Sequence, residues 1–597
     1  MTLRSNYDKF PVVQVSASPG NCQVGWSSIV EAIVGAIPFA TNERLHGASH
    51  NARTVLCVEC YPGVFDDQVE QALAAGLRPT LTVRTSALFK NSGEVDALVG
   101  HYLGDDPVFG RMNGIGVDDF FDPQKLAAAR ESIAKSRGLV FVVGTGAAHV
   151  VYEADVLVFA DMARWEIQMR YRRNEIGNLG ADNVSASVAE RYKRAYFVDW
   201  RAADRLKQKL LPEIDFLLDT NDPNTPKMIP GDALREALRI AAHRPFRVVP
   251  YFDPGPWGGH WMEKVCGLSP EGVPNHAWCF DCVPEENSML LGFGNVKVEI
   301  PSINLVFQHP HELLGEAVHA RFGKEFPIRF DFLDTMGGGN LSLQVHPLTE
   351  YIQDKFGMNY TQDESYYLLD AGDDGCVYLG LREEINCDAM LRDLRVAQSG
   401  GHAFPAESYV NVWPAKKHDH FLLPAGSIHC SGKNSMVLEI SATPYIFTFK
   451  LWDWGRLGLN GLPRPIHLDH GEANIQWDRT TNWVRRNLVN HITPLASGDG
   501  WREERTGLHE REFIETRRHW FTGMVPHRGT GGVNVLNLVE GREAVVESPT
   551  GAFEPFVVHY AETFIVPAAV GDYTIRPFGE AEGKECATIK AFVRTNP

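Results

Sequence analysis

The pattern of hydrophobic and polar residues along the chain changes near residue 245. In the first part, short apolar runs such as Pro11–Ser16 and Leu139–Gly144 alternate with stretches whose apolar residues recur at helical spacing, such as Ile29–Ile37. A short apolar run between turn residues is typical of a buried strand. Strands that alternate with amphipathic helices predict a doubly wound α/β layer for residues 1–245.

The second part of the chain has a β-prone pattern. Leu341–Val345 and Ser365–Leu369 are rich in strand-forming residues and lie between Gly and Pro clusters, and similar runs occur at 532–541 and 560–569. These patterns predict β-strands. We therefore expect a multidomain protein, with an α/β domain at 1–245 followed by all-β domains at 246–495 and 496–597.

Composition narrows the possible partners. The chain has 597 residues, of which 44% are hydrophobic, and a net charge of −18 without long runs of Lys or Arg, which argues against nucleic acid. Because no apolar stretch reaches the length of a membrane span and the N-terminus lacks a signal-peptide core, we expect a cytoplasmic protein without membrane contact. Ten cysteines are too few for a disulfide scaffold, so reduced thiols are expected. The oligomeric state stays open.

Four residues in the second part have the chemistry of a divalent-metal site. Gln344 and His346 lie two residues apart on a predicted strand, so their side chains point to the same face. Glu364 and His429 follow downstream. One carboxylate, two imidazoles and one amide oxygen suit zinc or a neighbouring first-row metal and leave a position for substrate. A single histidine is more often a packing residue, but four candidates together favour a metal.

These residues carry a resemblance to a known family. The Gln-x-His-Pro motif, the following Glu and a late His after Pro-x-Gly resemble the ligand motifs of the class I, cupin-type mannose-6-phosphate isomerases. The similarity spans roughly residues 247 to 597 and includes the segments Tyr251–Gly259, Leu438–Ser441, Trp452–Arg456 and Gly461–His467. It implies a metal-binding cupin (double-stranded β-helix) domain followed by a second cupin-like domain without a metal set of its own.

The resemblance also implies an activity and a set of site residues. The family converts mannose 6-phosphate to fructose 6-phosphate through a cis-enediol, with Zn²⁺ or another divalent metal as cofactor. By position, Arg456 and Arg464 would face the sugar phosphate, Ser342 would bind its phosphate, and Glu439 is a candidate base. A salt bridge is the alternative for each arginine, and a purely structural carboxylate is the alternative for Glu439. We expect His418 and His420, before the last ligand, to be solvated.

One departure from the family affects the predicted substrate site. Two residues before the metal-binding Glu, the family carries an active-site lysine, whereas this chain has Gln362. An amide donates hydrogen bonds but offers no positive charge to a phosphate or an enediolate. An isomerase of another or unphosphorylated sugar, or a non-catalytic sugar and nucleotide sensor, therefore stays open beside the main prediction.

The first part resembles the uridine-kinase-like P-loop kinases. Gly20–Ser28 has the spacing of a phosphate-binding loop between a strand and a helix, but Trp26 occupies the place of the lysine. Without that lysine the loop lacks a charge used in phosphoryl transfer. The resemblance implies a degenerate kinase domain that is structural or ligand-sensing, with Asp118, Asp119 and Asp161 as the residues that would serve nucleotide or magnesium. The alternative is an α/β domain without a ligand.

Overall fold

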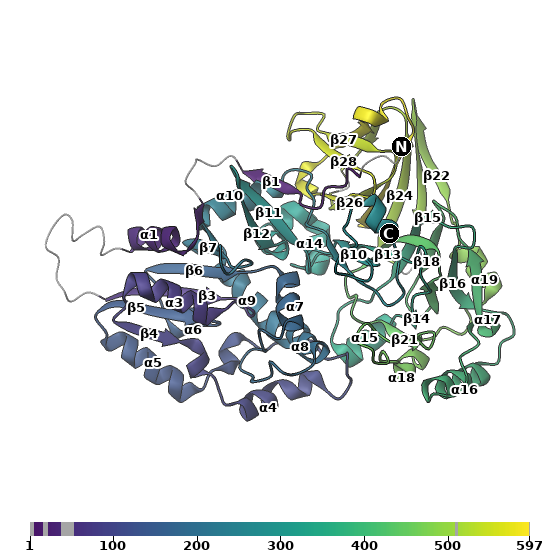
Figure 1. Cartoon of the computed structure of the whole chain (residues 1–597). Coiled ribbons are helices and arrows are strands. Elements are labelled where there is room, and N and C mark those ends of the chain that lie inside the picture. Colours follow the sequence, from purple (N-terminus) through teal and green to yellow (C-terminus); the bar gives the residue numbers. More distant parts are fainter. Residues whose placement is uncertain (1–4, 16–21, 38–52, 508–511, 530, 596–597) are drawn as a thin grey trace. The chain divides into compact units, whose positions relative to one another are not determined.

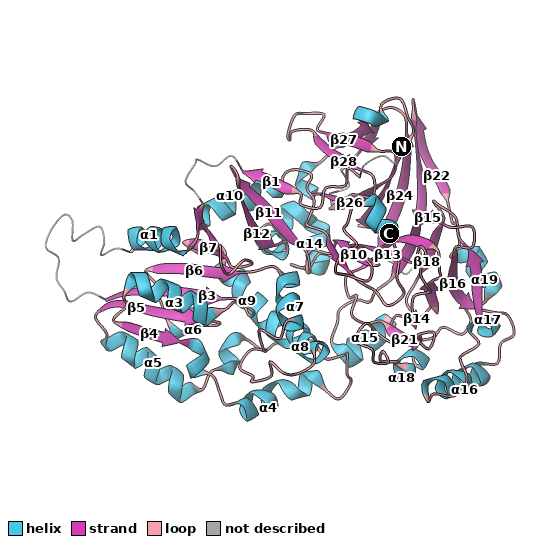
Figure 2. Cartoon of the chain, in the orientation of Figure 1, coloured by secondary structure: helices cyan, strands magenta, loops and turns pink. Residues whose placement is uncertain are grey.

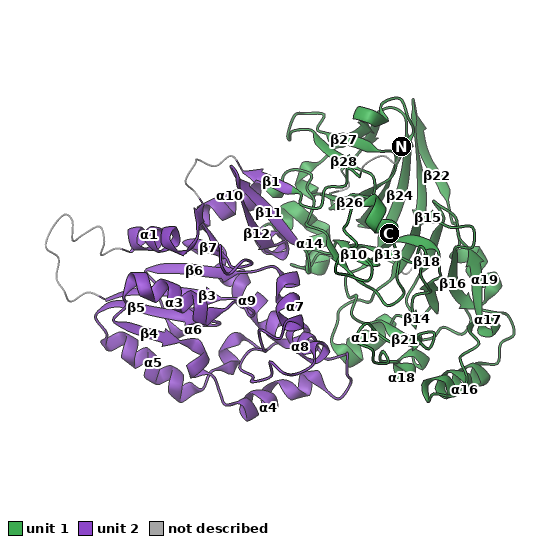
Figure 3. Ribbon diagram, viewed as in Figure 1, with its two compact units in different colours: residues 1–11, 241–287, 309–597 green, residues 12–240, 288–308 purple. Residues whose placement is uncertain are grey.

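The computed structural model describes residues 5–15, 22–37, 53–507, 512–529 and 531–595 (Figure 1). The chain divides into two compact units, coloured separately in Figure 3. Unit 2 comprises residues 12–240 and 288–308, and unit 1 comprises residues 1–11, 241–287 and 309–597. The chain therefore enters unit 2 twice, which a single division near residue 245 does not describe.

Unit 2 contains a seven-stranded sheet with helices before and after its strands (Figure 2). Five neighbouring strands are parallel in the order β4-β5-β3-β6-β7, and β8 and β2 continue the sheet in the antiparallel sense. The alternation of strands and helices is that of the expected α/β layer. The strands are β2 (Gln23–Val24), β3 (Arg53–Cys60), β4 (Leu81–Arg84), β5 (Gly138–Gly144), β6 (Val156–Asp161), β7 (Phe216–Asp219) and β8 (Lys227–Pro230).

Local signals begin several helices of unit 2. Asn91 and Glu94 form a reciprocal capping box at the start of α4, and the Asp122 carboxylate accepts two backbone N–H groups at the start of α5. The helices are α1 (Trp26–Ala36), α3 (Asp66–Leu77), α4 (Ser92–Leu103), α5 (Pro123–Lys135), α6 (Ala147–Val150), α7 (Arg164–Arg172), α8 (Val188–Arg194), α9 (Trp200–Leu210), α10 (Gly231–Ala241) and α12 (Ile303–Gln308). Short helical turns lie at η1 (Thr85–Leu88), η2 (Val117–Phe120) and η3 (Ala195–Asp199).

A separate three-stranded sheet of unit 2 contains the first strand of the chain. β1 (Val12–Val15) pairs in parallel with β11 (Ser288–Phe293), which pairs with β12 (Val296–Pro301). The strand that precedes the predicted phosphate loop therefore lies outside the seven-stranded sheet. Of that loop, Gly20 and Asn21 lie outside the described residues, and α1 begins at Trp26. The strand, loop and helix of one sheet, which a P-loop requires, are not formed by β1 and α1.

The metal-ligand motifs of unit 1 lie in two antiparallel sheets, as expected for a cupin barrel. The first sheet has the order β18-β15-β20-β13-β10-β9 and the second β17-β16-β19-β14-β21. Their strands are β9 (Tyr251–Asp253), β10 (Trp278–Cys282), β13 (Ile328–Asp334), β15 (Glu364–Ala371), β18 (His420–Leu423) and β20 (Ser435–Ala442), then β14 (Leu343–Val345), β16 (Cys376–Leu381), β17 (Val410–Pro414), β19 (His429–Ser431) and β21 (Phe449–Trp452). We call this region the first barrel.

The end of the chain forms a second pair of antiparallel sheets, here called the second barrel. The sheet orders are β22-β23-β24-β31-β26-β29 and β25-β30-β27-β28, and Leu536, Val546 and Phe564 pack in one buried core. The strands are β22 (Thr493–Gly498), β23 (Trp501–Gly507), β24 (Ile514–Phe521), β25 (Val525–His527), β26 (Asn534–Glu540), β27 (Glu543–Glu547), β28 (Phe556–His559), β29 (Thr563–Val566), β30 (Tyr573–Pro577) and β31 (Cys586–Val593).

Short helices connect the strands of unit 1. They are α11 (Trp261–Val265), α13 (Pro310–Leu314), α14 (Glu316–Phe322), α15 (Thr349–Phe356), α16 (Cys387–Gln398), α17 (Ala406–Tyr409), α18 (Leu468–Glu472) and α19 (Thr481–Asn487), with turns at η4 (Ala568–Val570) and η5 (Gly579–Ala581). Within the described parts of the chain, no helix is both long and apolar enough to cross a bilayer. All ten cysteines are free thiols.

Candidate metal centre and active site

The four predicted metal ligands lie together inside the first barrel. Gln344 on β14 is in register with His429 on β19, and their side-chain nitrogens are 3.3 Å apart. Glu364 is the first residue of β15, and its carboxylate contacts both imidazoles. Its Oε1 lies 2.7 Å from His429 Nε2, and its Oε2 lies 3.2 Å from His346 Nε2. Strands from both sheets thus bring one carboxylate, two imidazoles and one amide to a single place.

The other ring nitrogens fix the orientation of both imidazoles. His346 Nδ1 lies 3.2 Å from the Phe447 carbonyl oxygen, and His429 Nδ1 lies 2.9 Å from the Ser427 carbonyl oxygen. A carbonyl only accepts hydrogen bonds, so each Nδ1 carries a proton and Nε2 is the nitrogen left to face a metal. This is the tautomer that binds a metal through Nε2.

Two buried polar atoms of this centre lack a hydrogen-bond partner in the described part of the chain and would suit a metal ion. Among the described residues, His346 Nε2 and Glu364 Oε1 have no partner in hydrogen-bond geometry, although both are buried. Ligand atoms of His346, Glu364 and His429 all lie within 4.8 Å of one another. Rotation of the Gln344 amide would add an oxygen ligand. Burial opposes the charge of Glu364, but the two histidines outweigh burial and hold the pKa of this carboxyl well below its usual value.

Glu439 lies on the same inner face as Glu364. Ser441 and Glu439 on β20 are in register with Glu364 and Tyr366 on β15, so these side chains share a face. The Glu439 Oε1 atom accepts hydrogen bonds from Ser441 Oγ at 2.9 Å, Arg329 at 2.9 Å and Gln362 Nε2 at 3.2 Å. Burial, followed by the charge of Glu364, raises the pKa of Glu439 well above its usual value.

Gln362 connects the metal ligand to the candidate base. Its Nε2 donates to Glu364 Oε2 at 2.9 Å as well as to Glu439, and its side chain is buried. Gln362 therefore contacts both carboxylates but brings no charge. Arg329 on β13 brings charge instead, since it is 3% exposed and pairs with both Glu439 and Asp331.

The Asp453 carboxylate contacts Ser342 and Arg464, two of the predicted substrate-binding residues, and Arg456, which was predicted to be catalytic. The carboxylate accepts hydrogen bonds from Ser342 Oγ at 2.9 Å, from Arg456 at 2.6 and 3.0 Å, and from Arg464 at 3.1 Å. Arg464 also donates to Ser342 Oγ at 3.0 Å. The salt-bridge alternative for the two arginines is therefore present in the structure, but the salt bridge lies next to Ser342, two residues from the metal ligand Gln344.

Lys450 is a further cation on this side of the barrel. It lies on β21 in register with Gln344, so the two side chains share a face. Burial, and to a smaller extent Arg464, lowers the pKa of the Lys450 ammonium to about 7. Lys450 is thus only partly charged near neutral pH, whereas Arg456 and Arg464 bring two full charges to the carboxylate of Asp453.

Comparison with known proteins separates the two parts of the chain. Mannose-6-phosphate isomerase ManA of Bacillus subtilis is 22% identical over 353 residues, which are 56% of this chain and 93% of that protein. Mannose-6-phosphate isomerase of Streptococcus mutans is 26% identical over 214 residues, which are 36% of this chain and 62% of that protein. The C-terminal part of this chain is homologous to mannose-6-phosphate isomerases.

Solved structures and a family model complete the comparison. The crystal structure of the mannose 6-phosphate isomerase from Bacillus subtilis aligns with a TM-score of 0.47 and 19% identity, over 59% of this chain and all of that chain. A zinc-bound mannose 6-phosphate isomerase aligns with a TM-score of 0.44 and 15% identity over the same share of this chain. A family model described as a domain of unknown function (DUF8485) matches residues 25–243.

Sequence reasoning missed three charged residues of the isomerase-like region: Arg329, Asp453 and Lys450. Alternation along the strand gave a usable signal for Arg329, since Arg329 and Asp331 are charged residues two apart in an otherwise apolar strand. The expectation that His420 is solvated is wrong, because this residue is fully buried and burial lowers its pKa to about 3. His418 is half-buried, with Nε2 lying 3.1 Å from Glu540.

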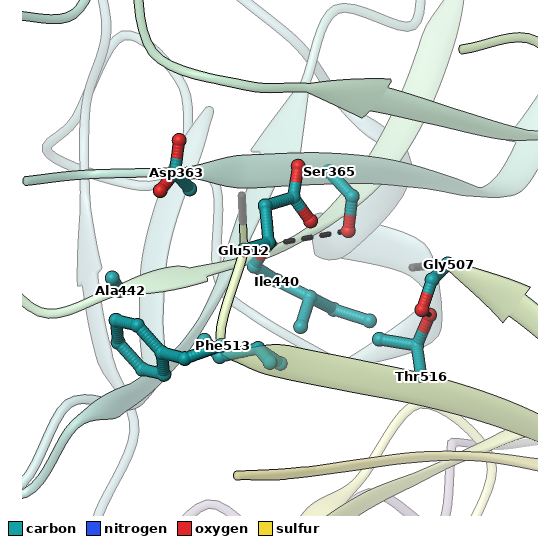
Figure 4. A pocket seen from close by; sticks show the side chains of 9 residues that line it. Asp363, Ser365, Ile440, Ala442, Gly507, Glu512, Phe513 and Thr516 are labelled. Atoms are coloured by element: carbon teal, nitrogen blue, oxygen red, sulfur yellow. Dashed lines mark hydrogen bonds between the residues drawn. The ribbon is translucent and has the colours of Figure 1, made fainter. Parts of the chain in front are cut away.

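A small cavity on the outer face of the same strands is too small to be the substrate site. It measures about 10 Å³ and lies between Ser365 and Ile440 of the first barrel and Glu512 and Thr516 of the second (Figure 4). Ser365 follows Glu364 and so points to the opposite face of β15. The volume admits about one water molecule. This cavity is therefore too small to hold a sugar.

The acidic residues predicted for unit 2 differ in burial and in their partners. Asp161 is buried and accepts hydrogen bonds from Lys207 Nζ at 2.7 Å and Asn304 Nδ2 at 2.9 Å. Asp118 and Asp119 lie exposed in η2. Asp161 is thus already neutralised by a lysine of its own unit.

Proposed function

We propose that unit 1 is a divalent-metal-dependent aldose–ketose isomerase that interconverts mannose 6-phosphate and fructose 6-phosphate. The observation that carries this proposal is the convergence of His346 Nε2, His429 Nε2 and the Glu364 carboxylate, with both imidazoles held in the metal-binding tautomer. These ligands lie in the part of the chain that is homologous to mannose-6-phosphate isomerases.

In this proposal Gln344, His346, Glu364 and His429 hold the metal. When bound, zinc or another divalent first-row ion supplies a Lewis acid that stabilises negative charge developing on a substrate oxygen. The carbonyls of Phe447 and Ser427 keep the two imidazoles in the tautomer and orientation that this binding needs.

Glu439 is the group that we assign to proton transfer between C1 and C2. Its Oε1 is fixed by the three donors Ser441, Arg329 and Gln362, whereas the same contacts leave Oε2 to the substrate. Its raised pKa makes it a stronger base than an exposed carboxylate when ionised. Gln362 acts through this carboxylate, because its amide donates to both Glu439 and Glu364.

Ser342, Arg456, Arg464 and Lys450 are the groups that we assign to the sugar phosphate. Guanidinium forks match phosphate oxygens, and a desolvated ammonium adds a point charge. Asp453 holds the two arginines and Ser342 in place. This excess of cations favours a phosphorylated sugar over a free sugar, although Gln362 contributes no charge.

The test is a coupled assay of mannose 6-phosphate conversion, with zinc supplied. We expect turnover that is lost in His429→Ala together with bound metal, since this residue supplies one of two imidazole ligands. Free mannose at equal concentration should be a poor substrate. A preference for the free sugar that persists at saturating phosphate would refute the phosphorylated substrate, and a metal-loaded protein without turnover on any hexose would favour a sensor.

For unit 2 we propose a degenerate kinase-like domain without phosphoryl transfer, in which β1 has left the sheet that a phosphate loop would need. Trp26 occupies the place of the lysine that a phosphate-binding loop would carry. Open α/β sheets bind ligands where the strand order reverses, which in this sheet is beside the ends of β3 and β6. Tyr61 and Asp161 at these ends already contact Asp204 and Lys207 of α9. ATP consumption by the purified protein in the presence of a sugar would overturn this proposal.

A further inference from the structure

A second hollow of unit 1 has walls that are distinct from the metal centre. Its volume is about 1050 Å³, and it is formed by the N-terminal segment 5–9, the end of α11, Lys417 and residues 540–542 and 560 of the second barrel. None of the proposed metal ligands lines it. Ligand sites in proteins commonly measure about 300–1,000 Å³, so this hollow accommodates a metabolite.

The walls of the hollow are held by specific contacts. Tyr7 is buried and its hydroxyl donates to Asp281 at 2.5 Å. Ser5 Oγ donates to the Val265 carbonyl oxygen at 2.5 Å, and Asn6 Nδ2 donates to the Arg542 carbonyl oxygen at 3.4 Å. The N-terminal segment is therefore a fixed wall of the hollow.

The lining carries more positive than negative side chains, in a chain whose net charge is −18. Lys9, Lys264, Lys417 and Arg542 line it, with Glu540 as the one lining carboxylate. Lys417 pairs with Glu540 at 2.6 Å, and Arg542 pairs with Glu580, outside the lining, at 3.0 Å. Lys9 donates to the neutral Gly267 carbonyl at 2.7 Å, and within the described residues no carboxylate forms an ion pair with Lys9 or Lys264. At least two cations thus remain uncompensated.

An aromatic ring lies beside these charges. Tyr560 lines the hollow, the Lys417 ammonium lies 5.5 Å from its ring centre, and the Trp261 ring packs edge-on against it at 6.0 Å. Ammonium and guanidinium groups bind phosphate oxygens, and an aromatic ring offers a flat apolar face to a base or a sugar. The hollow can therefore bind a ligand that carries both anionic groups and a base or a sugar.

We propose that this hollow is a binding site for a metabolite that carries several phosphate groups. It is separate from the proposed isomerase centre and does not depend on that function. Lys264 and Lys9 supply uncompensated charge, Arg542 and Lys417 supply further donors, and Tyr560 contacts the organic part of the ligand.

Titration calorimetry of the full chain with two probes, inorganic tripolyphosphate and ATP, tests the proposal. The His429→Ala variant is used as background, because it removes metal that would chelate either probe. We expect saturable binding that weakens at least about tenfold in Lys264→Glu, which reverses one charge of the wall, and stays unchanged in Lys355→Glu, an exposed lysine outside the hollow. Because Lys264 is exposed, its substitution should leave the fold intact.

The two probes identify the part of the ligand that is recognised. ATP that binds more tightly than tripolyphosphate, with the difference lost in Tyr560→Leu, indicates that the ring contacts the organic part. Equal affinities overturn the role of Tyr560 and leave a polyphosphate site. Absence of saturable binding by both probes overturns the proposal, as does equal weakening in Lys264→Glu and Lys355→Glu, which would indicate only diffuse charge.

Discussion

Replacement of Arg329 by methionine tests the buried charge network beside the metal centre. Arg329 is 3% exposed and holds two buried carboxylates, Asp331 and Glu439, the latter at 2.9 Å. Methionine keeps much of the side-chain volume but leaves both acids without their cation. Removing one partner of a buried ion pair costs about 3–5 kcal/mol, so we expect a loss of this size in the free energy of unfolding at mildly alkaline pH.

The loss should depend on pH with a definite sign. Arg329 lowers the pKa of both carboxyls, so in its absence they bind protons in the folded state at higher pH than now. When folding raises the pKa of a carboxyl, the protonated carboxyl stabilises the folded state at pH values below the pKa of the unfolded state. This stabilisation is lost as the pH rises through the pKa of the folded state. The difference between wild type and Arg329→Met should therefore shrink as the pH falls toward about 6, the pKa that Asp331 has with Arg329 in place.

Urea denaturation followed by tryptophan fluorescence at several pH values measures this difference. Arg395→Met is the matched control, because Arg395 is 49% exposed and pairs with Asp469 and Glu472 at the surface. Arg395→Met should lower the free energy of unfolding by only about 0–1 kcal/mol. A loss for Arg329→Met no larger than that of the control, or one that grows on acidification, would refute the reasoning.

Three further predictions concern the metal, the substrate and unit 2. Chelation should abolish mannose 6-phosphate turnover and lower the melting temperature, with zinc restoring both; unchanged melting would contradict a metal held by buried ligands. Asp453→Asn should raise KM for mannose 6-phosphate about tenfold with a smaller effect on kcat, because Arg456 and Arg464 lose their anchor; an effect on kcat alone would contradict this role. Lys207→Met should destabilise unit 2 by about 3–5 kcal/mol, since Asp161 is buried, without changing isomerase turnover measured below the melting transition.

The sequence predicted which four side chains converge in the candidate metal centre, because their chemistry is carried by short motifs. Gln344 and His346 share a strand, so period-two alternation was enough to place them on one face. Joining them to Glu364 and His429 relied on the family resemblance, and the structure brings all four together.

The surrounding charges could not be predicted in the same way. Arg329 and Glu439 are 110 positions apart in the chain, and only the register of β13 with β20 makes them neighbours. The same limit applies to β1, whose partner β11 lies far downstream. The local pattern of apolar residues identified residues 12–15 as a strand, but it carried no information on which sheet this strand would join.

The return of residues 288–308 to unit 2 has a consequence for how the protein is made. β1 emerges from the ribosome early, but its partner β11 is translated only after the α/β sheet and part of unit 1. Unit 2 can therefore complete its second sheet only when synthesis has passed residue 301, where β12 ends. A gene fragment that stops near residue 245 would encode an unpaired edge strand, so the two units are tied to a single polypeptide in biosynthesis.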